Sequence, residues 1–447
     1  MELREAFECV AEVVPGELKR FQGHIDPVWI EEALEATGTA TVRRRRLPAD
    51  QVVWMVLGMG LLRDDAIERV VDSLDLALPS GRGGLVAKSA IAQARQRLGD
   101  EPLAYLFATT AAAWAEKSAD RHRWRGLAIY GADGTTLRVA DTVENREAFG
   151  GQGAGGGRGE CGYPMVRVLG LMALRSHLLS ALRFADYRTG EVTLADELWR
   201  ELPDDSLTIV DRNFLVADHL TSLVRSGNNR HWLTRAKSTT RLKTLCRLGK
   251  KDELVEIELS DSTRRIYPHL PAIWQARAIT YQRKGFAPSV LLTSLLDPEQ
   301  YPASELVAMY HERWEIELGY DEIKTHMLAR QETIRSKTPQ GVRQEIWGIA
   351  IAYNLVRLEM ERAAAEAKVE PNRISFVYAL SLVCREWQRA SAPRAAIGNI
   401  PRDLATLRLN LKRLVLPSRR PNRSFPRAVK IKMSNYARKR PSVKGAK

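Results

Sequence analysis

The chain has 447 residues, of which 45% are hydrophobic and 27% charged, with a formal net charge of +14. This composition excludes a disordered chain and suits two or three domains. The four cysteines lie far apart without a CxxC pair, which indicates neither a cysteine zinc site nor a disulfide framework and favours a reducing compartment. The longest apolar runs, 52–62 and 347–357, are about half of the ~20 residues that a membrane span needs. The N-terminus shows no signal peptide, so we expect a soluble cytoplasmic protein without a membrane partner.

The positive charge is concentrated at the C-terminus. Residues 411–447 contain thirteen Lys or Arg and no Asp or Glu. Residues 418–447 mix basic residues with Pro, Ser and single aromatic residues, a composition that cannot build a core but suits phosphate contact. Arg43 to Arg46 form a second basic cluster. We predict nucleic-acid contact for the tail; the alternative is a solvated tail that only aids solubility.

Helical periodicity dominates residues 1 to about 120. Within this part, residues 89–100 predict a helix with Ser89 as N-cap and Gly99 at its end. The predicted helix has an apolar face and a polar face, formed respectively by Ile91, Ala94 and Leu98 and by Gln93, Gln96 and Arg97. The polar face is typical both of a DNA recognition helix and of an ordinary amphipathic surface helix, and the sequence leaves both open.

Strand-like segments follow from about residue 127. Short apolar runs rich in β-formers occur at 127–141, 163–177, 178–188, 207–214 and 230–237. Helical stretches near 191–201 and 214–226 lie between the later runs, which predicts a mixed α/β sheet. Gly151, Gly153 and Gly156 formally match GxGxxG, but they precede a strand rather than a helix, so we reject a dinucleotide site. The sequence contains no GxxxxGK[ST] phosphate loop either.

Two acidic residues follow apolar strands. Asp133 stands at the expected end of one strand and Asp211 at the end of another. Each alone is more often a turn-former or a cap. Together with a carboxylate on a following helix, they predict a site for Mg²⁺, which prefers oxygen ligands.

The segment 310–327 supplies that helix. Tyr310, Arg313, Glu317 and Lys324 stand at i, i+3, i+7 and i+14, which places them on one stripe of a regular α-helix. A carboxylate for a metal, two cations for phosphates and a phenol for a sugar or base would then project together. The alternative is a solvated face with i, i+4 ion pairs. A zinc protease is excluded, because Glu315 stands where HExxH requires its second His.

This Y-x2-R-x3-E-x6-K spacing resembles the signature helix of the DDE transposases of bacterial insertion element four and its relatives. The segments around Asp133 and Asp211 resemble the first-Asp and second-Asp regions of that family. Residues 89–99 resemble its N-terminal domain and residues 347–357 its C-terminal helix. The resemblance covers roughly residues 30 to 420.

The resemblance implies a ribonuclease H-like catalytic core of class α/β. Asp133 would lie on the first strand, Asp211 after the fourth, and Glu317 on the following helix. The 105 residues between Asp211 and Glu317 are too many for a loop and would contain a mostly β insertion. The implied organisation is a helical N-terminal domain, the core, its insertion, a helical C-terminal region and a basic tail, at 1–120, 121–338, about 238–300, 339–417 and 418–447.

The implied activity is cut-and-paste DNA transposition by phosphodiester hydrolysis and transesterification. Asp133, Asp211 and Glu317 would hold two Mg²⁺ ions, with Mn²⁺ able to substitute, and would serve nicking, hairpin formation, hairpin opening and strand transfer. The DNA partners would be the terminal inverted repeats and the target, bound by a homodimer on the bacterial nucleoid. The implied DNA contacts are a phenol for a distorted or flipped nucleotide and four phosphate-binding cations: Tyr310, Arg313, Lys324, Arg235 and Lys237.

One position departs from the family pattern. Some relatives place a Trp just before the strand at 290–294, where this chain has Ser289. Trp274 or Trp232 could substitute, although we expect both to be buried core residues. Hairpin formation is therefore less well supported than cleavage. Two other readings stay open, a ribonuclease H-like nuclease without transposition and a non-catalytic DNA-binding protein derived from a transposase.

Overall fold

The computed structural model describes residues 25–40, 47–74, 76, 86–153, 160–271, 273–283, 285–329, 333–390 and 407–416. Arg43 to Arg46 and the tail 418–447 lie outside the described residues, so the predicted basic contacts there stay predictions. No helix of the described part is long and apolar enough to cross a membrane.

The N-terminal part is helical, as the periodicity predicts. Its elements are α2 (Pro27–Ala36), α3 (Ala49–Leu61), α4 (Ile67–Ser73), α5 (Lys88–Leu98), α6 (Glu101–Ala111), η2 (Ala112–Glu116) and α7 (Lys117–Arg121). Helix α5 buries Ile91, Ala94 and Leu98 as expected, and ends at Gly99 with a φ of 73°. The predicted Ser89 cap is wrong: the N-cap position is Ala87, two residues earlier, and no side chain caps the helix.

A five-stranded core follows, made of β1 (Ala128–Val139), β3 (Glu160–Ala173), β4 (Leu178–Asp186), β5 (Ser206–Val210) and β6 (Arg230–Arg235). Strands β4, β3 and β1 are antiparallel neighbours, and β5 and β6 continue the sheet parallel to β1. Helix α9 (Glu191–Trp199) leads from β4 to β5, and helix α10 (Ala217–Arg225) connects the parallel strands β5 and β6. This mixed α/β order confirms the ribonuclease H-like fold class. Smaller elements lie at its edges: α8 (Val143–Phe149), β2 (Gly151–Gly153) and η3 (Arg212–Phe214).

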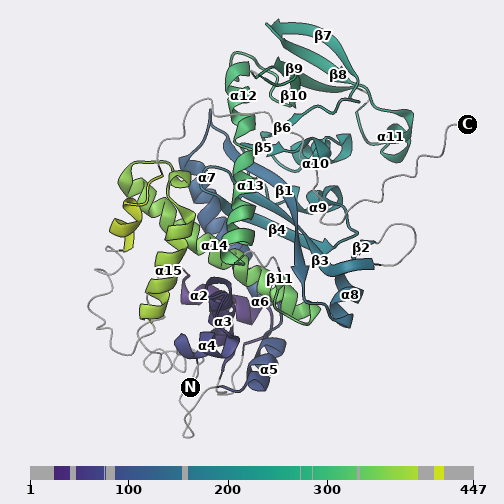
Figure 1. Cartoon of the computed structure of the whole chain (residues 1–447). Helices are drawn as coiled ribbons and strands as arrows, with labels where there is room; N and C mark the ends of the chain where they lie inside the picture. Colours follow the sequence, from purple (N-terminus) through teal and green to yellow (C-terminus); the bar gives the residue numbers. More distant parts are fainter. Residues whose placement is uncertain are drawn as a thin grey trace, which may run out of the picture.

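The segment between the parallel strands and the signature helix is mostly β. It contains β7 (Leu242–Gly249), β8 (Asp252–Ile257), α11 (Asp261–Ile266), β9 (Trp274–Tyr281) and β10 (Ser289–Thr293). Strand β10 pairs with β6, so these strands extend the central sheet and rise from it as an antiparallel ribbon (Figure 1). The fully buried Arg277 forms a two-pronged ion pair with Asp252 at 2.8 and 2.5 Å, which fixes β9 to β8.

The chain then returns across the sheet through α12 (Ala303–His311), α13 (Trp314–Asp321), η4 (Glu322–Met327) and β11 (Thr333–Ile334). The C-terminal elements are α14 (Pro339–Ala367), η5 (Pro371–Arg373) and α15 (Phe376–Ala390). Helix α14 packs on α3 at two glycines: a Cβ on Gly60 would lie 3.2 Å from Ala352, and one on Gly348 would lie 2.9 Å from the Val56 carbonyl oxygen. The N-terminal helices are thereby fixed to the C-terminal region.

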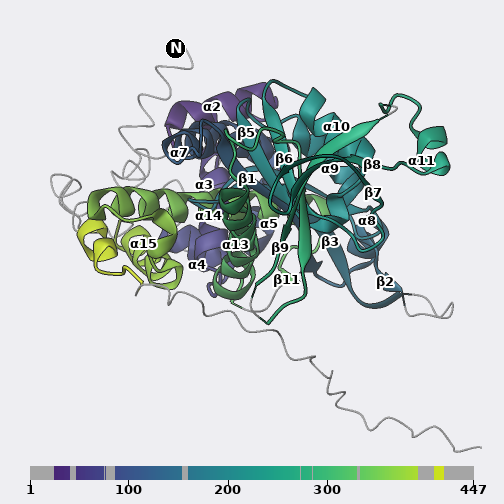
Figure 2. The ribbon, with the colours of Figure 1, turned by 90° about the horizontal axis from the view of Figure 1, so that it is seen from above.

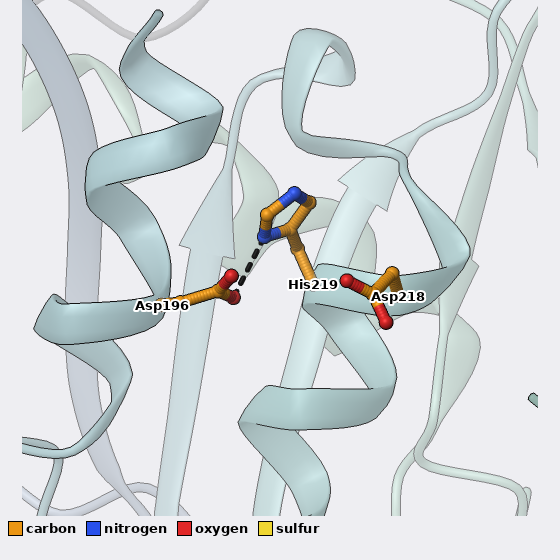
Figure 3. A group of neighbouring side chains, drawn as sticks. All are labelled: Asp196, Asp218 and His219. Atoms are coloured by element: carbon orange, nitrogen blue, oxygen red, sulfur yellow. Dashed lines mark hydrogen bonds and ion pairs between the residues drawn. The ribbon is translucent and has the colours of Figure 1, made fainter. Parts of the chain in front are cut away.

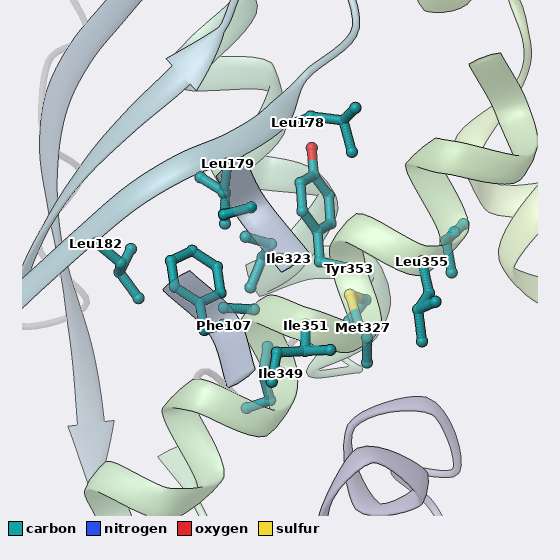
Figure 4. Close-up of a cluster of buried hydrophobic side chains, with 14 of the residues drawn as sticks. Phe107, Leu178, Leu179, Leu182, Ile323, Met327, Ile349, Ile351, Tyr353 and Leu355 are labelled. Carbon is teal, nitrogen blue, oxygen red and sulfur yellow. The ribbon is translucent and has the colours of Figure 1, made fainter. Parts of the chain in front are cut away.

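The two faces of the sheet are covered differently. Helices α9 and α10 pack on the face that carries Tyr130 and Ala132. The opposite face, which carries Ile129 and Leu137, packs against α13, α14 and the N-terminal helices. In Figure 2, α9 and α10 lie apart from α14. Figure 4 shows side chains of α6, β4, η4 and α14 meeting in this larger core.

Candidate active site

Asp133 lies in the middle of β1 rather than at its end, so that expectation is wrong. The strand continues to Val139 because the next residues keep pairing with β3, as far as Arg138 opposite Met165. What ends near Asp133 is complete burial: residues 128–132 are all buried and residues 133–136 are partly exposed. Asp133 therefore stands where a rigid strand emerges from the core.

The environment of Asp133 penalises its negative charge. Its pKa is raised to about 6, mainly by burial and also by the charges of Glu317 and Glu191. A hydrogen bond of 2.9 Å from the Gly134 backbone N–H and the charge of Arg313 act in the opposite direction. A bound cation would relieve the penalty, which is the electrostatic setting expected of a metal ligand.

Asp211 follows β5, the parallel neighbour of β1. The register pairs Ala132 with Val210, so the next residues, Asp133 and Asp211, leave the paired region at the same level of the sheet. The Asp211 carboxylate accepts a 2.9 Å hydrogen bond from the Asn213 N–H and caps η3. The sheet therefore brings two acidic residues, 78 positions apart in the sequence, to adjacent strands.

The segment that carries Tyr310, Arg313, Glu317 and Lys324 is not one regular α-helix. Helix α12 ends at His311, and the N–H groups of Glu312, Arg313 and Glu315 bond to carbonyls three residues back. These tighter bonds form a short turn between α12 and α13. Lys324 then lies in the π-helical turn η4. The predicted single regular helix, which assumed 3.6 residues per turn throughout, is therefore wrong, and the shared face of the four side chains stays a prediction.

Arg313 nevertheless connects two of the three predicted metal-binding carboxylates, Asp133 and Glu317. Its guanidinium donates to Glu317 Oε1 at 2.6 Å and lies 3.6 Å from Asp133 Oδ2. Burial lowers the pKa of Arg313, but the charge and hydrogen bond of Glu317 outweigh burial and raise it overall. Arg313 is 9% exposed, so it stays a charged link between β1 and α13.

Other predicted residues surround this centre. Lys324 Nζ donates to Thr135 Oγ1 at 3.4 Å, two residues along β1 from Asp133. Burial raises the pKa of Tyr310, whose hydroxyl lies in the fields of Arg313, Asp211 and Arg235. Lys237 Nζ donates to the Leu215 carbonyl beyond η3 at 3.4 Å. Tyr310, Arg235 and Lys237 thus lie on the Asp211 side, and Lys324 on the other side of Asp133.

Gln93, Gln96 and Arg97 are on the exposed face of α5, in the N-terminal helical part. Arg95, on the same helix, faces inward and donates to Gln344 at 2.7 Å and Ser336 at 2.9 Å. Helix α5 is thereby held on α14 with its polar face outward. This placement is compatible with a surface that contacts DNA away from the carboxylates. It is equally compatible with an ordinary solvent-exposed face.

Trp232 and Trp274 are both buried, as expected, with ring centroids 5.9 Å apart. Neither is open to a nucleobase. Tyr281 is the residue directly opposite Ser289 in the β9–β10 pair. Its ring lies 5.8 Å from the His311 ring, which in turn lies 6.1 Å from the Tyr310 ring. The sequence alone did not single out Tyr281, because only strand register places it opposite Ser289.

Two other neighbours of Asp133, Tyr320 and Glu191, were not predicted from the sequence. The Tyr320 hydroxyl donates to the Asp133 carbonyl oxygen at 2.6 Å. Glu191, at the start of α9, pairs with Arg167 at 2.8 Å, and its carboxylate lies where a Cβ on Gly134 would stand. Gly134 thus allows Glu191 to lie against the backbone beside Asp133. The glycine after the aspartate was the one available signal in the sequence.

A buried polar network supports the back of the signature segment. His177, in the turn between β3 and β4, lies 2.9 Å from Glu315 and 3.4 Å from Glu322. Glu322 also accepts a 2.8 Å hydrogen bond from Tyr353 and lies 3.6 Å from Arg357, both on α14. This network anchors the side of α13 and η4 that faces away from Asp133.

The donor set of the site fits a divalent metal. Asp133, Asp211 and Glu317 offer only carboxylate oxygens, the ligand type that Mg²⁺ and Mn²⁺ prefer. Asp133 comes from strand β1, Asp211 from the position directly after strand β5, and Glu317 from the packed helix α13. The arrangement can therefore support metal-assisted chemistry on a phosphate.

Comparison with known proteins agrees with this geometry. Residues 15–108 match the model of the insertion element 4 transposase N-terminal domain, and residues 124–355 match the transposase DDE domain. The chain is 38% identical over 417 residues to "Transposase InsG for insertion sequence element IS4" of Escherichia coli K12, covering 92% of each chain. It is 33% identical over 298 residues to "Putative transposase InsZ" of the same organism, covering 66% of this chain and 93% of that protein.

Among solved structures, a piggyBac transposase synaptic complex with hairpin DNA, determined by cryo-EM, aligns with a TM-score of 0.42 and 12% identity. The alignment covers 91% of this chain and 87% of that one. A likeness this distant carries no argument about function.

Proposed function

The chain belongs to the insertion element 4 family of DDE transposases, and we propose that it cuts and joins the ends of its own insertion sequence through Asp133, Asp211 and Glu317. As a DDE transposase it is an enzyme that acts on DNA and uses a divalent metal. The observation that carries the residue assignment is the Arg313 link between Asp133 and Glu317. It places two of the three carboxylates together from segments far apart in the sequence.

The metal in this proposal is Mg²⁺, held as two ions by the three carboxylates. When bound, such ions activate the attacking oxygen and stabilise the leaving oxygen of an in-line displacement. The contribution of the chain is rigidity: Asp133 and Asp211 are held by the sheet, and Glu317 by Arg313 and the packed helix.

The cations around the carboxylates would bind the DNA backbone. Arg313 and Lys324 flank Asp133 and would contact phosphates next to the scissile bond. Arg235 and Lys237 lie on the Asp211 side and would follow the strand away from the cut. The exposed face of α5, with Gln93, Gln96 and Arg97, would contact the terminal repeat away from the cut.

Cut-and-paste transposition through hairpin ends needs a place for a nucleotide out of its stack. In this proposal Tyr310 holds that nucleotide, and Tyr281 provides the aromatic surface at the position opposite Ser289. Two element ends must be cut and joined together, so we propose a homodimer as the working form. The enzyme would act in the bacterial cytoplasm, on the nucleoid where its DNA lies.

The test is a cleavage assay on linear DNA that carries the ends flanking this gene, with Mg²⁺ or EDTA, resolved on a denaturing gel. Asp133→Asn, Asp211→Asn and Glu317→Gln should each lower cleavage by more than about 10²-fold, since even residues that only orient a metal ligand cost 10–100-fold. The matched control is Asp141→Asn, an exposed carboxylate eight residues after Asp133 that pairs with Arg146. It should cut like the wild type.

The possible outcomes distinguish the transposase from the two alternative functions. Mg²⁺-dependent nicks that proceed to hairpins and joined products support the full proposal. Nicks without joining would leave a ribonuclease H-like nuclease. Binding of the ends without metal-dependent cutting would leave a non-catalytic DNA-binding protein.

A further inference from the structure

A second group of ligand-type side chains lies on the face of the sheet opposite the signature segment. Asp196 is on α9, and Asp218 and His219 are in the first turn of α10 (Figure 3). These two helices pack in the buried cluster on the Tyr130 face, whereas α13 packs on the other face. The group is therefore separate from Asp133, Asp211 and Glu317.

The ligand atoms of this group converge. Asp196, Asp218 and His219 each offer one ligand atom, and these atoms lie within 4.8 Å of one another; among the described residues, this is the one such group of three or more. His219 Nδ1 lies 2.7 Å from Asp196 Oδ1, and Figure 3 shows the imidazole between the two carboxylates. His269, from the segment after α11, is not part of this converging group, but its Nε2 lies 2.6 Å from Asp218 Oδ1.

The charge of the group is unbalanced. When both imidazoles are neutral, the two carboxylates leave two negative charges side by side, and among the described residues neither carboxylate forms an ion pair with Lys or Arg. The Asp218 side chain is 17% exposed and the Asp196 side chain 41% exposed, so water screens the Asp218 charge poorly and the Asp196 charge only in part. One divalent cation would balance the two charges.

We propose that Asp196, Asp218 and His219 bind one Zn²⁺ ion and that His269, which already contacts Asp218, turns in as the fourth ligand. Two imidazole nitrogens and two carboxylate oxygens make a four-donor set of the kind that Zn²⁺ takes in proteins. This mixed set differs from the oxygen-only set of Asp133, Asp211 and Glu317, which suits Mg²⁺. Binding would replace the two direct His–Asp hydrogen bonds with bonds to the metal and would release any proton that they share.

The role that follows is structural. Helix α11 has no buried residue, and beside it only Leu259 and Leu270 pack, partly buried, against the core. His269 is the donor that comes from this segment, so a metal would tie residues 258–271 of the insertion to α10 of the catalytic core. Arg264 and Arg265, in the last turn of α11, would then be held at a defined place on the surface.

The test uses the untagged full-length protein, stripped with EDTA and dialysed. Zn²⁺ is titrated by calorimetry into the wild type, His269→Ala and His219→Ala, and trypsin cleavage after Arg264 and Arg265 is timed with and without Zn²⁺. His122→Ala is the matched control, because His122 faces one carboxylate, Glu370, at 3.8 Å. His269 is 56% exposed, so its loss should not affect folding.

We expect one saturable Zn²⁺ per chain in the wild type and in the control, with Zn²⁺ slowing cleavage in α11. His269→Ala should weaken binding by at least about tenfold and remove the protection, a loss of the size seen when metal sites lose supporting groups. Equal Zn²⁺ affinity in wild type and His269→Ala would overturn the proposal, as would the absence of a saturable site. Zn²⁺ binding that is lost in Asp133→Asn but kept in His269→Ala would assign the ion to the catalytic carboxylates and would also overturn it.

Discussion

In the proposed site, Arg313 would act differently before and after metal and DNA bind. Without metal, its guanidinium lies between Asp133 and Glu317 at 3.6 and 2.6 Å and reduces the repulsion between their carboxylates. With DNA bound, the same cation would meet a phosphate. A residue that holds the carboxylates in place before the metal binds lowers the cost of assembling the site.

At the same scale, we predict that Tyr281 stacks on the unstacked nucleotide in place of a tryptophan at position 289. Tyr281→Ala should lower hairpin formation about tenfold and leave the first nick unchanged, because stacking on one aromatic ring contributes about 1–3 kcal/mol per base. Tyr281→Phe should retain the wild-type rate. The measurements are the nicking rate on intact element ends and the rate of hairpin formation on pre-nicked ends.

The control for this prediction is Tyr378→Ala, which removes an aromatic side chain that is 62% exposed on α15. It should change neither step. A wild-type hairpin rate in Tyr281→Ala would show that another group holds the unstacked base.

At the scale of elements, the signature segment depends on its buried side as much as on its exposed side. Burial alone raises the pKa of the Glu322 carboxyl, but Arg357 and His177 outweigh burial and hold the pKa below its usual value. The network among His177, Glu315, Glu322, Tyr353 and Arg357 thus fixes η4, the turn that carries Lys324, to the β3–β4 turn and to α14.

We predict that Glu322→Gln lowers the free energy of unfolding by about 3 kcal/mol at neutral pH, because it leaves the buried Arg357 charge without its partner. A lowered folded-state pKa means that this contribution is present above the ordinary Glu pKa of about 4.3 and is lost as the pH falls through the folded-state value. Urea unfolding of both proteins from pH 7 to pH 3 measures it. A stability difference that stayed constant down to pH 3 would contradict the assigned role of the charge.

The contact between α3 and α14 gives a second prediction for elements. Gly348→Ala should destabilise the protein by about 1–3 kcal/mol, because the new methyl group would lie 2.6 Å from Val56 Cγ1 and 2.9 Å from its carbonyl oxygen. The backbone oxygen cannot move without shifting α3. Thermal unfolding of the purified protein measures the loss.

Gly190→Ala is the control for this substitution. A Cβ there would meet nothing closer than 3.7 Å, and the φ of −70° suits any residue. Its unfolding temperature should stay close to that of the wild type. Equal destabilisation by both substitutions would argue against close packing of α3 on α14.

At the scale of the whole molecule, charge and catalysis lie in different parts of the chain. Residues 411–447 hold thirteen of the 68 basic residues and no acidic residue, so the rest of the chain is nearly neutral. The proposed active site holds carboxylates that repel phosphate until a metal binds. General attraction to DNA should therefore come mainly from outside the catalytic core.

Deleting residues 418–447, which removes eleven basic side chains, should weaken DNA binding and flatten its dependence on salt. The slope of log K against log salt should fall by roughly 0.9 for each DNA phosphate that the shortened chain no longer neutralises. Fluorescence anisotropy at several salt concentrations measures it. A variant with the same tail residues in scrambled order should keep the slope, and an unchanged slope after deletion would return the tail to a solubility role.

Several properties of this protein followed from the sequence by itself. The spacing of Tyr310, Arg313, Glu317 and Lys324 identified the family, and apolar runs of the right length predicted the mixed sheet. The burial of Ile91, Ala94 and Leu98 followed from helical periodicity. Such features depend on spacing and local chemistry, which the order of residues contains directly.

Other properties were decided only by tertiary structure. The strand through Asp133 continues because β3 pairs with it, and α12 and α13 are separate helices because backbone hydrogen bonds tighten between them. The pairing of Tyr281 with Ser289 and the meeting of His269 with Asp218 join positions that are apart in the chain. Register, packing and long-range electrostatics arise between elements, so no local pattern in the sequence could specify them.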